Sequence, residues 1–499
     1  MANFSLLNKW SFLLGILLTA SIFILLHLGW NWWVVTIPRP LPQNPTFDFT
    51  RSNNFLRGNY YEVSIPPTGS AQYLSADYRL WIPDGIPTIR GLIIRQHKCG
   101  VDPLTLSGLI YANDLQLQAL AQKHQFAILG TKLTTNSQLN VKYPDHPCNS
   151  WADIDRGSEE AFLNALLILA QKSHRPELDK LPWALWGYSG GADWVMQMLE
   201  KYPERTIAVV AVRSGGVIII QSEPGKLLTS EINSAVLRVP ALFALGEKDC
   251  EWECLGLPKK VFSRYRKAGA LWTLAVEANS DHAPDDTRLL AIPYLDAILT
   301  TRLKAHDAQL SQVDVAPSWL GNPTTHAISP MNQYEGDPRE AAWLPNEETA
   351  RKWQAYITTP GIWNRVRFRL CRMEKLSSFL GILHLSRSCY PGKISPTRKP
   401  AAPTNVHAAS IGVREVGLTW NFVPDLENGL PSFRIYRDKS LIATLHGQGL
   451  NYGDFPEPPD VVLEFRDKEA TVNSSYCISA FNVLGESTCQ PTQSTILKR

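Results

Sequence analysis

A serine lies where a run of apolar residues turns sharply into a helical pattern. The apolar run 181–186 leads into Gly-Tyr-Ser-Gly-Gly at 187–191, and residues 192–202 have the spacing of an amphipathic helix. A G-x-S-x-G sequence between a strand and a helix holds its serine on a strained, exposed turn, and glycines flank the serine because Cβ atoms would collide there. Ser189 is therefore a candidate nucleophile, and the Gly190 amide is a candidate oxyanion donor. The plain alternative is a glycine-rich turn with an incidental serine.

Two later apolar runs end in polar groups that could activate a serine. Run 241–245 is followed by Gly-Glu-Lys-Asp, ending at Asp249, and run 271–278 is followed by Asn-Ser-Asp-His, ending at His282. A histidine can take the serine proton, and a carboxylate can hold the imidazole in the useful tautomer. Taken alone, the aspartate could be a turn residue and the histidine a loop residue or helix cap. Glu247 is the alternative acid.

Short apolar runs alternate with helical patterns on both sides of these groups. Continuous apolar runs of this length are typical of strands buried on both faces, and their alternation with helices predicts a mostly parallel sheet in an α/β domain. The expected strands are 60–65, 78–82, 91–94, 126–130, 181–186, 207–212, 241–245 and 271–276, and the expected helices include 109–124 and 154–172.

The chain order serine, acid, histidine is the order in which α/β-hydrolases carry their triad. Residues 58–304 resemble an α/β-hydrolase of the serine esterase or depolymerase type, with Ser189, Asp249 and His282 at the matching motif positions. In that fold a second oxyanion amide comes from the loop after the third strand, commonly written His-Gly-X-Gly. This chain has His-Lys-Cys-Gly at 97–100. The resemblance implies that Cys99 supplies the second amide, although the preceding lysine departs from the family pattern.

Composition limits the class of protein. The chain has 499 residues, 44% of them hydrophobic and 19% charged, which is typical of globular proteins with two or three domains. The formal charge is only +3, yet residues 361–400 hold nine Lys or Arg against one acid, so this insert carries 9 − 1 = +8 and the rest 3 − 8 = −5. A local basic insert favours a membrane surface or an anionic polymer over nucleic acid, and a solvated basic linker is the alternative.

The N-terminal segment predicts export. From Trp10 to Val35 no Lys, Arg, Asp or Glu occurs, and three tryptophans lie near its end. At about 1.5 Å rise per residue, a helix of this length exceeds the hydrocarbon core of roughly 30 Å. We expect residues 1–37 to be an uncleaved membrane anchor with the catalytic domain outside, and 38–57 to be a linker. A cleaved signal peptide, giving a secreted protein, is the alternative.

Residues 305–400 follow the expected hydrolase domain. Trp319, Trp343 and Trp353 indicate an extension that packs on that domain before the basic insert begins. Within the insert, residues 379–385 are apolar but too short to span a bilayer. They could lie on a membrane surface or within a disulfide-closed loop.

From residue 401 the pattern changes to short alternating strands separated by turns, which indicates a β-sandwich over 401–499. The expected strands are 405–409, 416–422, 432–437, 461–465, 475–481 and 492–497. Leu-Thr-Trp at 418–420, Phe-Arg-Ile-Tyr at 433–436 and Tyr-Cys-Ile-Ser-Ala at 476–480 resemble a fibronectin type III domain, in which Trp420 and Tyr476 would be core residues. Such modules bind, space or display, so contact with a polysaccharide or another surface is expected there, and no catalysis.

The chain has eight cysteines without the C-x-x-C or paired-histidine spacing of a zinc site, and an even number fits disulfides in an exported protein. Cys477 and Cys489 lie symmetrically about the turn between the last two strands, which predicts a cross-strand bond. Weaker candidate pairs are Cys99 with Cys148, Cys250 with Cys254, and Cys371 with Cys389.

These features together predict an exported serine hydrolase that cleaves an ester through an acyl-enzyme, with no metal or organic cofactor. A peptidase or an acyltransferase would use the same groups, because the acyl-enzyme is common to all three. A non-catalytic, surface-binding scaffold is the alternative from another class, and Lys98 in the oxyanion loop favours it. The expected partners are an ester of unknown identity and the membrane.

Overall fold

A computed structural model describes residues 58–358 and 399–494 with gaps at 70, 100–107, 136–150, 215–230, 251–254, 284–286, 304–309, 413, 424–425, 427–430, 446–462, 472 and 483. The candidate anchor 1–37, the linker 38–57, and Cys371 and Cys389 of the basic insert lie outside these residues. Within the described ranges, no helix has both the length and the apolar character needed to cross a bilayer.

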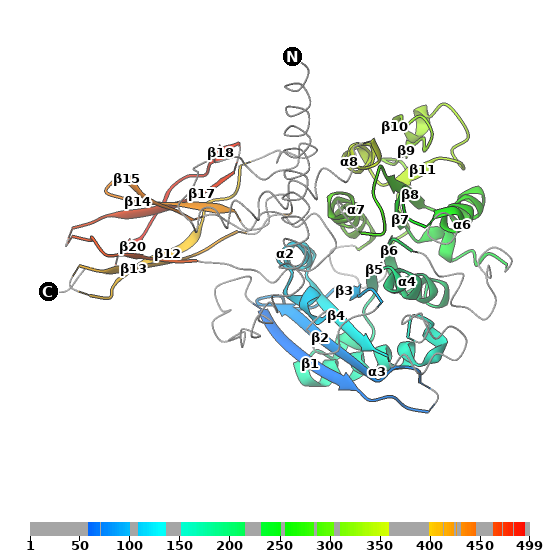
Figure 1. Cartoon of the computed structure of the whole chain (residues 1–499), viewed down its shortest axis with the longest axis horizontal. Helices are drawn as coiled ribbons and strands as arrows, with labels where there is room; N and C mark the ends of the chain where they lie inside the picture. The colour runs from blue at the N-terminus through cyan, green and yellow to red at the C-terminus, as the bar shows by residue number, and fades with distance from the viewer. Residues whose placement is uncertain are drawn as a thin grey trace, which may run out of the picture. The chain divides into compact units, whose positions relative to one another are not determined.

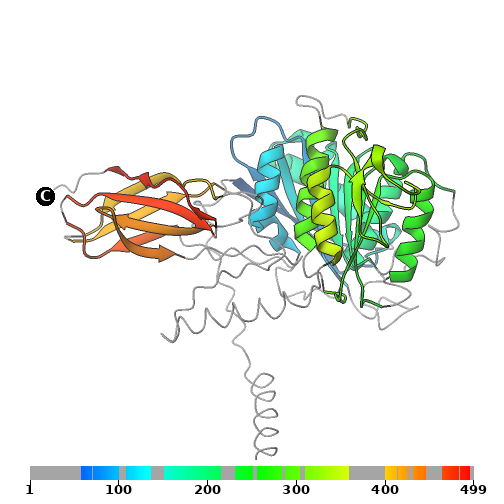
Figure 2. The ribbon, with the colours of Figure 1, turned by 90° about the horizontal axis from the view of Figure 1, so that it is seen from above.

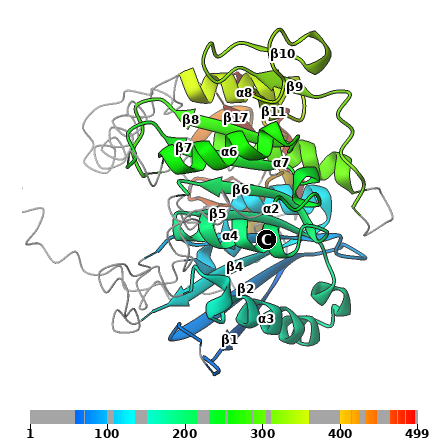
Figure 3. The same cartoon turned by 90° about the vertical axis from the view of Figure 1, so that its right-hand side faces the viewer.

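The first described region is built on one eight-stranded sheet (Figure 1). Its strands are β1 (Gly58–Ile65), β2 (Ser75–Pro83), β3 (Gly91–Gln96), β4 (Phe126–Thr134), β5 (Trp183–Tyr188), β6 (Thr206–Val212), β7 (Ala241–Gly246) and β8 (Trp272–Glu277). They lie in the order β1-β2-β4-β3-β5-β6-β7-β8. Figure 3 shows the sheet from the side, with β1 lowest. β2 is antiparallel to both of its neighbours, and the pairs from β4 to β8 are parallel. The prediction of a mostly parallel sheet is confirmed.

Helices cover both faces of this sheet, which explains why its central strands are apolar throughout. On one face lie α3 (Ser158–Ser173), α4 (Gly190–Lys201) and α6 (Leu257–Lys267). On the other lie α2 (Leu115–His124), α7 (Thr287–Arg302) and α8 (Glu347–Thr358), side by side in Figure 2. Every residue of β3, β4, β5, β6 and β7 is buried as a result.

Two helices begin later than their periodicity predicts. The pattern 109–124 divides into a 3-10 turn, Leu109–Asn113, and α2, because the Asp114 carboxylate accepts hydrogen bonds from the Gln116 and Leu117 amides and caps a new helix. The pattern 154–172 likewise divides at Gly157, whose φ of 95° ends the short turn before α3. Apolar spacing alone does not reveal such breaks, because the buried positions continue on both sides of them.

The extension after α7 belongs to the same core as the sheet. It contains β9 (Trp319–Gly321), β10 (Ile328–Pro330), β11 (Ala342–Leu344) and α8, and the three strands form a small sheet in the order β10-β9-β11. Trp343 and Trp353 are buried in the cluster that also holds residues of α2 and α7. The Trp353 Nε1–H donates to the Leu274 carbonyl of β8 at 2.8 Å. Burial of these two indoles fixes the extension against the sheet.

The described residues of the C-terminal region form strands and no helix, and we call this part the all-β region. Its strands are β12 (Thr404–Ser410), β13 (Val416–Asn421), β14 (Ser432–Arg437), β15 (Ser440–Leu445), β16 (Glu464–Asp467), β17 (Tyr476–Asn482), β18 (Gly485–Glu486), β19 (Gln490–Pro491) and β20 (Gln493–Ser494). One sheet has the order β16-β13-β12-β20, and the other has β15-β14-β17-β18 with β19 beside β17. Buried side chains of both sheets, including Trp420 and Phe433, form a single cluster. Tyr476 is buried, and its hydroxyl donates to Asp467 at 2.7 Å.

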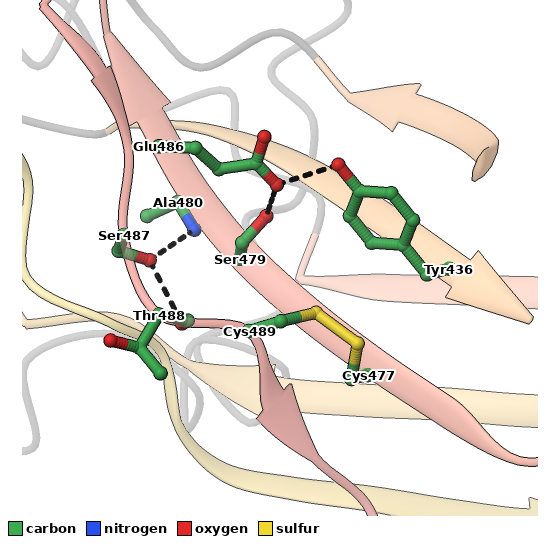
Figure 4. The surroundings of a disulfide bond; sticks show 8 residues. All are labelled: Tyr436, Cys477, Ser479, Ala480, Glu486, Ser487, Thr488 and Cys489. Carbon is green, nitrogen blue, oxygen red and sulfur yellow. Dashed lines mark hydrogen bonds between the residues drawn. A yellow bond between two sulfur atoms is a disulfide. The ribbon is translucent and has the colours of Figure 1, made fainter. Parts of the chain in front are cut away.

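A disulfide joins Cys477 of β17 to Cys489, with Cα atoms 5.5 Å apart (Figure 4). The strand register puts Pro491, and not Cys489, opposite Cys477. The predicted symmetry about the turn is therefore off by two positions. The short β18 pairs at the turn, and the chain between β18 and β19 carries Cys489 toward its partner from beside the strand.

Candidate active site

Ser189 lies between β5 and α4 in a backbone conformation that few side chains adopt. Its φ is 55° and its ψ is −124°, and α4 begins at the next residue. The Ser189 amide donates to the Val212 carbonyl at the end of β6, 2.8 Å away, which holds this turn against the neighbouring strand. A non-glycine residue kept at positive φ stores strain, and such residues cluster at functional sites.

The glycines of the turn allow three backbone segments to pack together. A Cβ atom on Gly187 would lie 2.0 Å from the Gly191 carbonyl oxygen. A Cβ atom on Gly191 would lie 2.4 Å from the His97 carbonyl oxygen, in the loop that follows β3. Larger residues would separate the strand, the helix and this loop, so both glycines are required for the geometry around Ser189.

His282 contacts both of the other predicted site residues. Its Nε2 lies 3.0 Å from Ser189 Oγ, and its Nδ1 lies 2.9 Å from Asp249 Oδ2. A carboxylate accepts only, so Nδ1 carries the proton and Nε2 is left to accept one from the serine hydroxyl. The Asp249 side chain is 4% exposed and that of His282 is 45% exposed. The imidazole therefore faces solvent in front of a buried carboxylate.

The structure separates the two candidate acids. Asp249 contacts the imidazole, and its Oδ1 also accepts a hydrogen bond from the Cys250 amide at 2.9 Å. The Glu247 carboxylate accepts instead from the Asn279 amide at 2.6 Å, at the start of the loop that carries His282. Glu247 thus contacts the backbone of that loop, while Asp249 contacts the ring.

Several contacts fix the loop that carries His282 at the end of β8. A Cβ atom on Gly246 would lie 2.3 Å from the Asp281 carbonyl oxygen, so the loop packs directly on the end of β7. The Lys248 amide donates to the Ser280 carbonyl at 2.7 Å. The Tyr188 hydroxyl, one residue before Ser189, donates to the His282 carbonyl at 3.0 Å. The loop is thereby held from the ends of β7, which is next to β8, and of β5, which lies two strands further along the sheet.

The loop after β3 lies beside the first turn of α4. Gly190 is the first residue of α4, and the amides of a helix's first turn have no acceptor within the helix. Cys99 lies three residues after the end of β3, is partly buried and is disulfide-bonded, while Lys98 is exposed. The loop containing Cys99 approaches α4 through the contact of His97 with Gly191.

His97 holds this loop and is not placed to act as a base. Its side chain is buried, and desolvation lowers its pKa from 6.5 to about 4, partly offset by a hydrogen bond to the Lys98 carbonyl. Nδ1 lies 2.5 Å from that carbonyl, and Nε2 accepts from the Leu133 amide at 2.7 Å. A neutral His97 therefore joins the loop to β4 with both ring nitrogens occupied.

Two more cysteines of the site region are in disulfides. Cys99 and Cys250 are both disulfide-bonded, and their expected partners, Cys148 and Cys254, lie outside the described residues. Cys250 follows Asp249 directly, so both bonds begin in loops next to the Ser189 and His282 pair. Among the described side chains, no group of three His, Cys, Asp or Glu residues is arranged to hold a metal ion.

Comparison with known proteins gives distant structural likenesses only. No family model and no curated protein sequence matches the chain. A thermostable esterase is 14% identical, with a TM-score of 0.31, over 44% of this chain and 54% of that one. An S-formylglutathione hydrolase from Agrobacterium tumefaciens is 12% identical, with a TM-score of 0.34, over 50% and 99%. A cold-adapted esterase from an Arctic intertidal metagenomic library is 16% identical, with a TM-score of 0.32, over 48% and 94%.

Sequence reasoning missed three side chains that support the site. Tyr188 lies inside the G-x-S-x-G motif, where its variable position carries no signal. Arg213 follows β6 and Glu277 ends β8, and they form a buried ion pair behind the loop that carries His282. Each charge stands at the end of an apolar run, a position that suggests exposure. Only the sheet order, which puts β7 between these strands, brings the two together.

Proposed function

We propose that this protein is a serine hydrolase that cleaves an ester through an acyl-enzyme intermediate. The observation that carries the proposal is the continuous chain of contacts from Ser189 Oγ to His282 Nε2 at 3.0 Å and from His282 Nδ1 to Asp249 at 2.9 Å. Nucleophile, base and orienting acid within hydrogen-bond reach are the signature of an activated serine.

In the proposed reaction, Ser189 attacks the ester carbonyl while His282 takes its proton. Asp249 keeps the proton on Nδ1 and stabilises the imidazolium that forms. The amides of Gly190 and Cys99 donate to the oxyanion of the tetrahedral intermediate. His282 then returns the proton to the departing alcohol, and water attacks the acyl-enzyme by the same steps in reverse.

A peptidase and an acyltransferase remain alternatives within this mechanism, since the leaving group and the acceptor are selected by the pocket. A scaffold without catalysis is the alternative outside it, and the exposed Lys98 beside Cys99 is the feature that favours it. Fluorophosphonate labelling separates the two classes, because only an activated serine reacts.

The proposal also covers the N-terminal segment and the C-terminal domain. We propose that residues 1–37 anchor the protein so that the hydrolase acts outside the cytoplasm, where its disulfides persist. The two C-terminal sheets share one core, which supports assignment of 401–499 to a fibronectin type III sandwich. We propose that this domain contacts a polysaccharide or another surface, and that nucleic acid is not a partner.

The experiment has two parts. Purified protein is first treated with a fluorophosphonate and analysed as peptides, with S189A and the exposed-site control S440A in parallel. We expect a single adduct at Ser189 in the wild type and in S440A. An ester panel of varied acyl length, including acetylated and feruloylated sugars and polyester oligomers, then identifies the substrate class. No adduct and no turnover would favour the scaffold.

A further inference from the structure

A buried arginine lies behind the loop that carries His282. Arg213 follows β6 directly, has a φ of 50°, and forms an ion pair with Glu277 of β8, with neither side chain exposed. Its Nη2 lies 2.5 Å from Glu277 Oε2. A buried ion pair is weak evidence for stability, because desolvation of both charges offsets their attraction. Its remaining contacts therefore indicate what the arginine does.

Those contacts are with the residues on both sides of His282. Nη2 of Arg213 donates to the Ala283 carbonyl at 3.0 Å and to Ser280 Oγ at 2.8 Å, and Nε donates to the same carbonyl at 3.3 Å. One rigid guanidinium thus contacts the chain two positions before the histidine and one position after it. Its planar fork of donors fixes direction as well as distance, which a lysine cannot do.

The other side of the guanidinium is held by the extension. Nη1 of Arg213 donates to the Tyr356 hydroxyl of α8 at 3.3 Å, and that hydroxyl donates to Glu277 Oε2 at 3.2 Å. Nη1 also donates to the Ala244 carbonyl of β7 at 3.2 Å. Burial by itself would lower the pKa of Arg213, but Tyr356 and Glu277 raise it above its ordinary value. The group therefore stays a cation inside the core.

We infer that Arg213 is a positioning residue for His282. We also infer that the extension, through Tyr356, helps to hold Arg213 in place and is therefore needed for full activity. This inference rests on the proposed function. A base must keep its ring nitrogen in line with the serine hydroxyl through every turnover, and a misplacement of about 1 Å can cost about 100-fold in rate. Arg213 supplies that constraint from the loop's inner side, as Tyr188 does from β5.

The test uses hydroxyl deletions matched in size. Y356F removes the contact of the extension with Arg213 and Glu277. Y265F is the control, because the buried Tyr265 of α6 also donates its hydroxyl to a glutamate, Glu200 at 2.6 Å, on the opposite face of the sheet from α8. S280A removes an acceptor of Arg213 on the loop itself. All three deletions are small, so folded protein is expected.

Four quantities are measured for each variant: kcat and KM on an active ester, the labelling rate with a fluorophosphonate, and Tm. We expect Y356F and S280A each to lower kcat and the labelling rate by about tenfold, with KM within about twofold of the wild type. Y265F should lower Tm and leave both rates within about twofold. The double variant Y356F/S280A should lose less than the product of the single losses, because both changes act through one arginine.

The outcomes separate this inference from the proposed function. If no fluorophosphonate labels the wild type, both the proposed function and this inference are wrong. If the wild type is labelled and both Y356F and S280A react as fast as Y265F, the inference alone is wrong. Arg213 is then only one half of a buried ion pair. Strictly multiplicative losses in the double variant would also contradict it, since the two hydroxyls would then act independently.

Discussion

His282 Nε2 lies 3.0 Å from Ser189 Oγ, although 93 positions of sequence separate the two residues. The distance is set by the sheet, since β5 carries the serine at its carboxyl end and β8 carries the histidine at the same edge, with β6 and β7 between them. The path of each loop at that edge therefore decides which side chains meet the imidazole.

Asp249→Asn should lower kcat by about 10⁴ with little change in Tm, because an amide can leave the imidazole in the wrong tautomer. Glu247→Gln is the matched comparison, since an amide oxygen can still accept the Asn279 hydrogen bond, and its loss of kcat should be far smaller. Steady-state kinetics on one ester measures both. A larger loss for the Glu247 variant would make that residue the acid.

His97 makes stability depend on pH. Its pKa is lowered from 6.5 to about 4 in the folded state by desolvation, so the unfolded chain binds the proton more readily. This pKa difference contributes about 3 kcal/mol to the free energy of unfolding. The contribution is fully present above pH 6.5 and is lost as the pH falls toward 4. Urea unfolding at pH 7 and pH 4.5 should reveal the loss in the wild type and a much smaller one in His97→Gln. Equal pH dependence in both proteins would exclude His97 as its source.

The bond between Cys477 and Cys489 closes a loop with a sequence separation of 12. Replacing both cysteines with serine should destabilise the C-terminal sheets by about 3 kcal/mol, because the unfolded chain gains freedom. Limited proteolysis should then cut after residue 400 sooner than in the wild type. Ester turnover by the full chain should not change, since this bond belongs to the all-β region. A parallel loss of turnover would link that region to catalysis.

Some features of the fold and the site could be predicted from the sequence, and others could not. The sharp turn at Ser189 could be predicted because its glycines, strand and helix are contiguous in the chain, while the role of Ser189 as nucleophile stays a prediction. The parallel sheet was also predictable, since continuous apolar runs report burial on both faces. Sequence favoured Asp249 over Glu247 only through the position of the family motif, because both follow the same strand and the path of the turn decides which carboxylate meets the ring.

The supporting residues were less accessible to sequence reasoning. Arg213, Glu277 and Tyr356 come from three elements far apart in the chain, and no spacing connects a buried charge to its partner. The extension strands β9, β10 and β11 are too short to show an alternating pattern. Cys489 was expected directly across from Cys477, but the chain leaves the hairpin register after β18.

The anchor prediction concerns residues outside the described ranges and is tested in cells. If the segment from Trp10 to Val35 is uncleaved, full-length protein should stay with membranes after carbonate washing. A mature N-terminus beyond about residue 30 would instead show that a signal peptide is removed.

The central claim is that Ser189 and His282 act as one unit. Turnover of an active ester should be compared among Ser189→Ala, His282→Ala and the double variant, with Tm measured for each. Each single change should lower kcat by several orders of magnitude, and the double variant should be no worse than either, because groups that act together fail together. Tm should stay close to the wild-type value. If Ser189→Ala kept its hydrolysis with an unchanged Tm, the sequence Gly-Tyr-Ser-Gly-Gly would be only a turn, and Ser189 would not be the nucleophile.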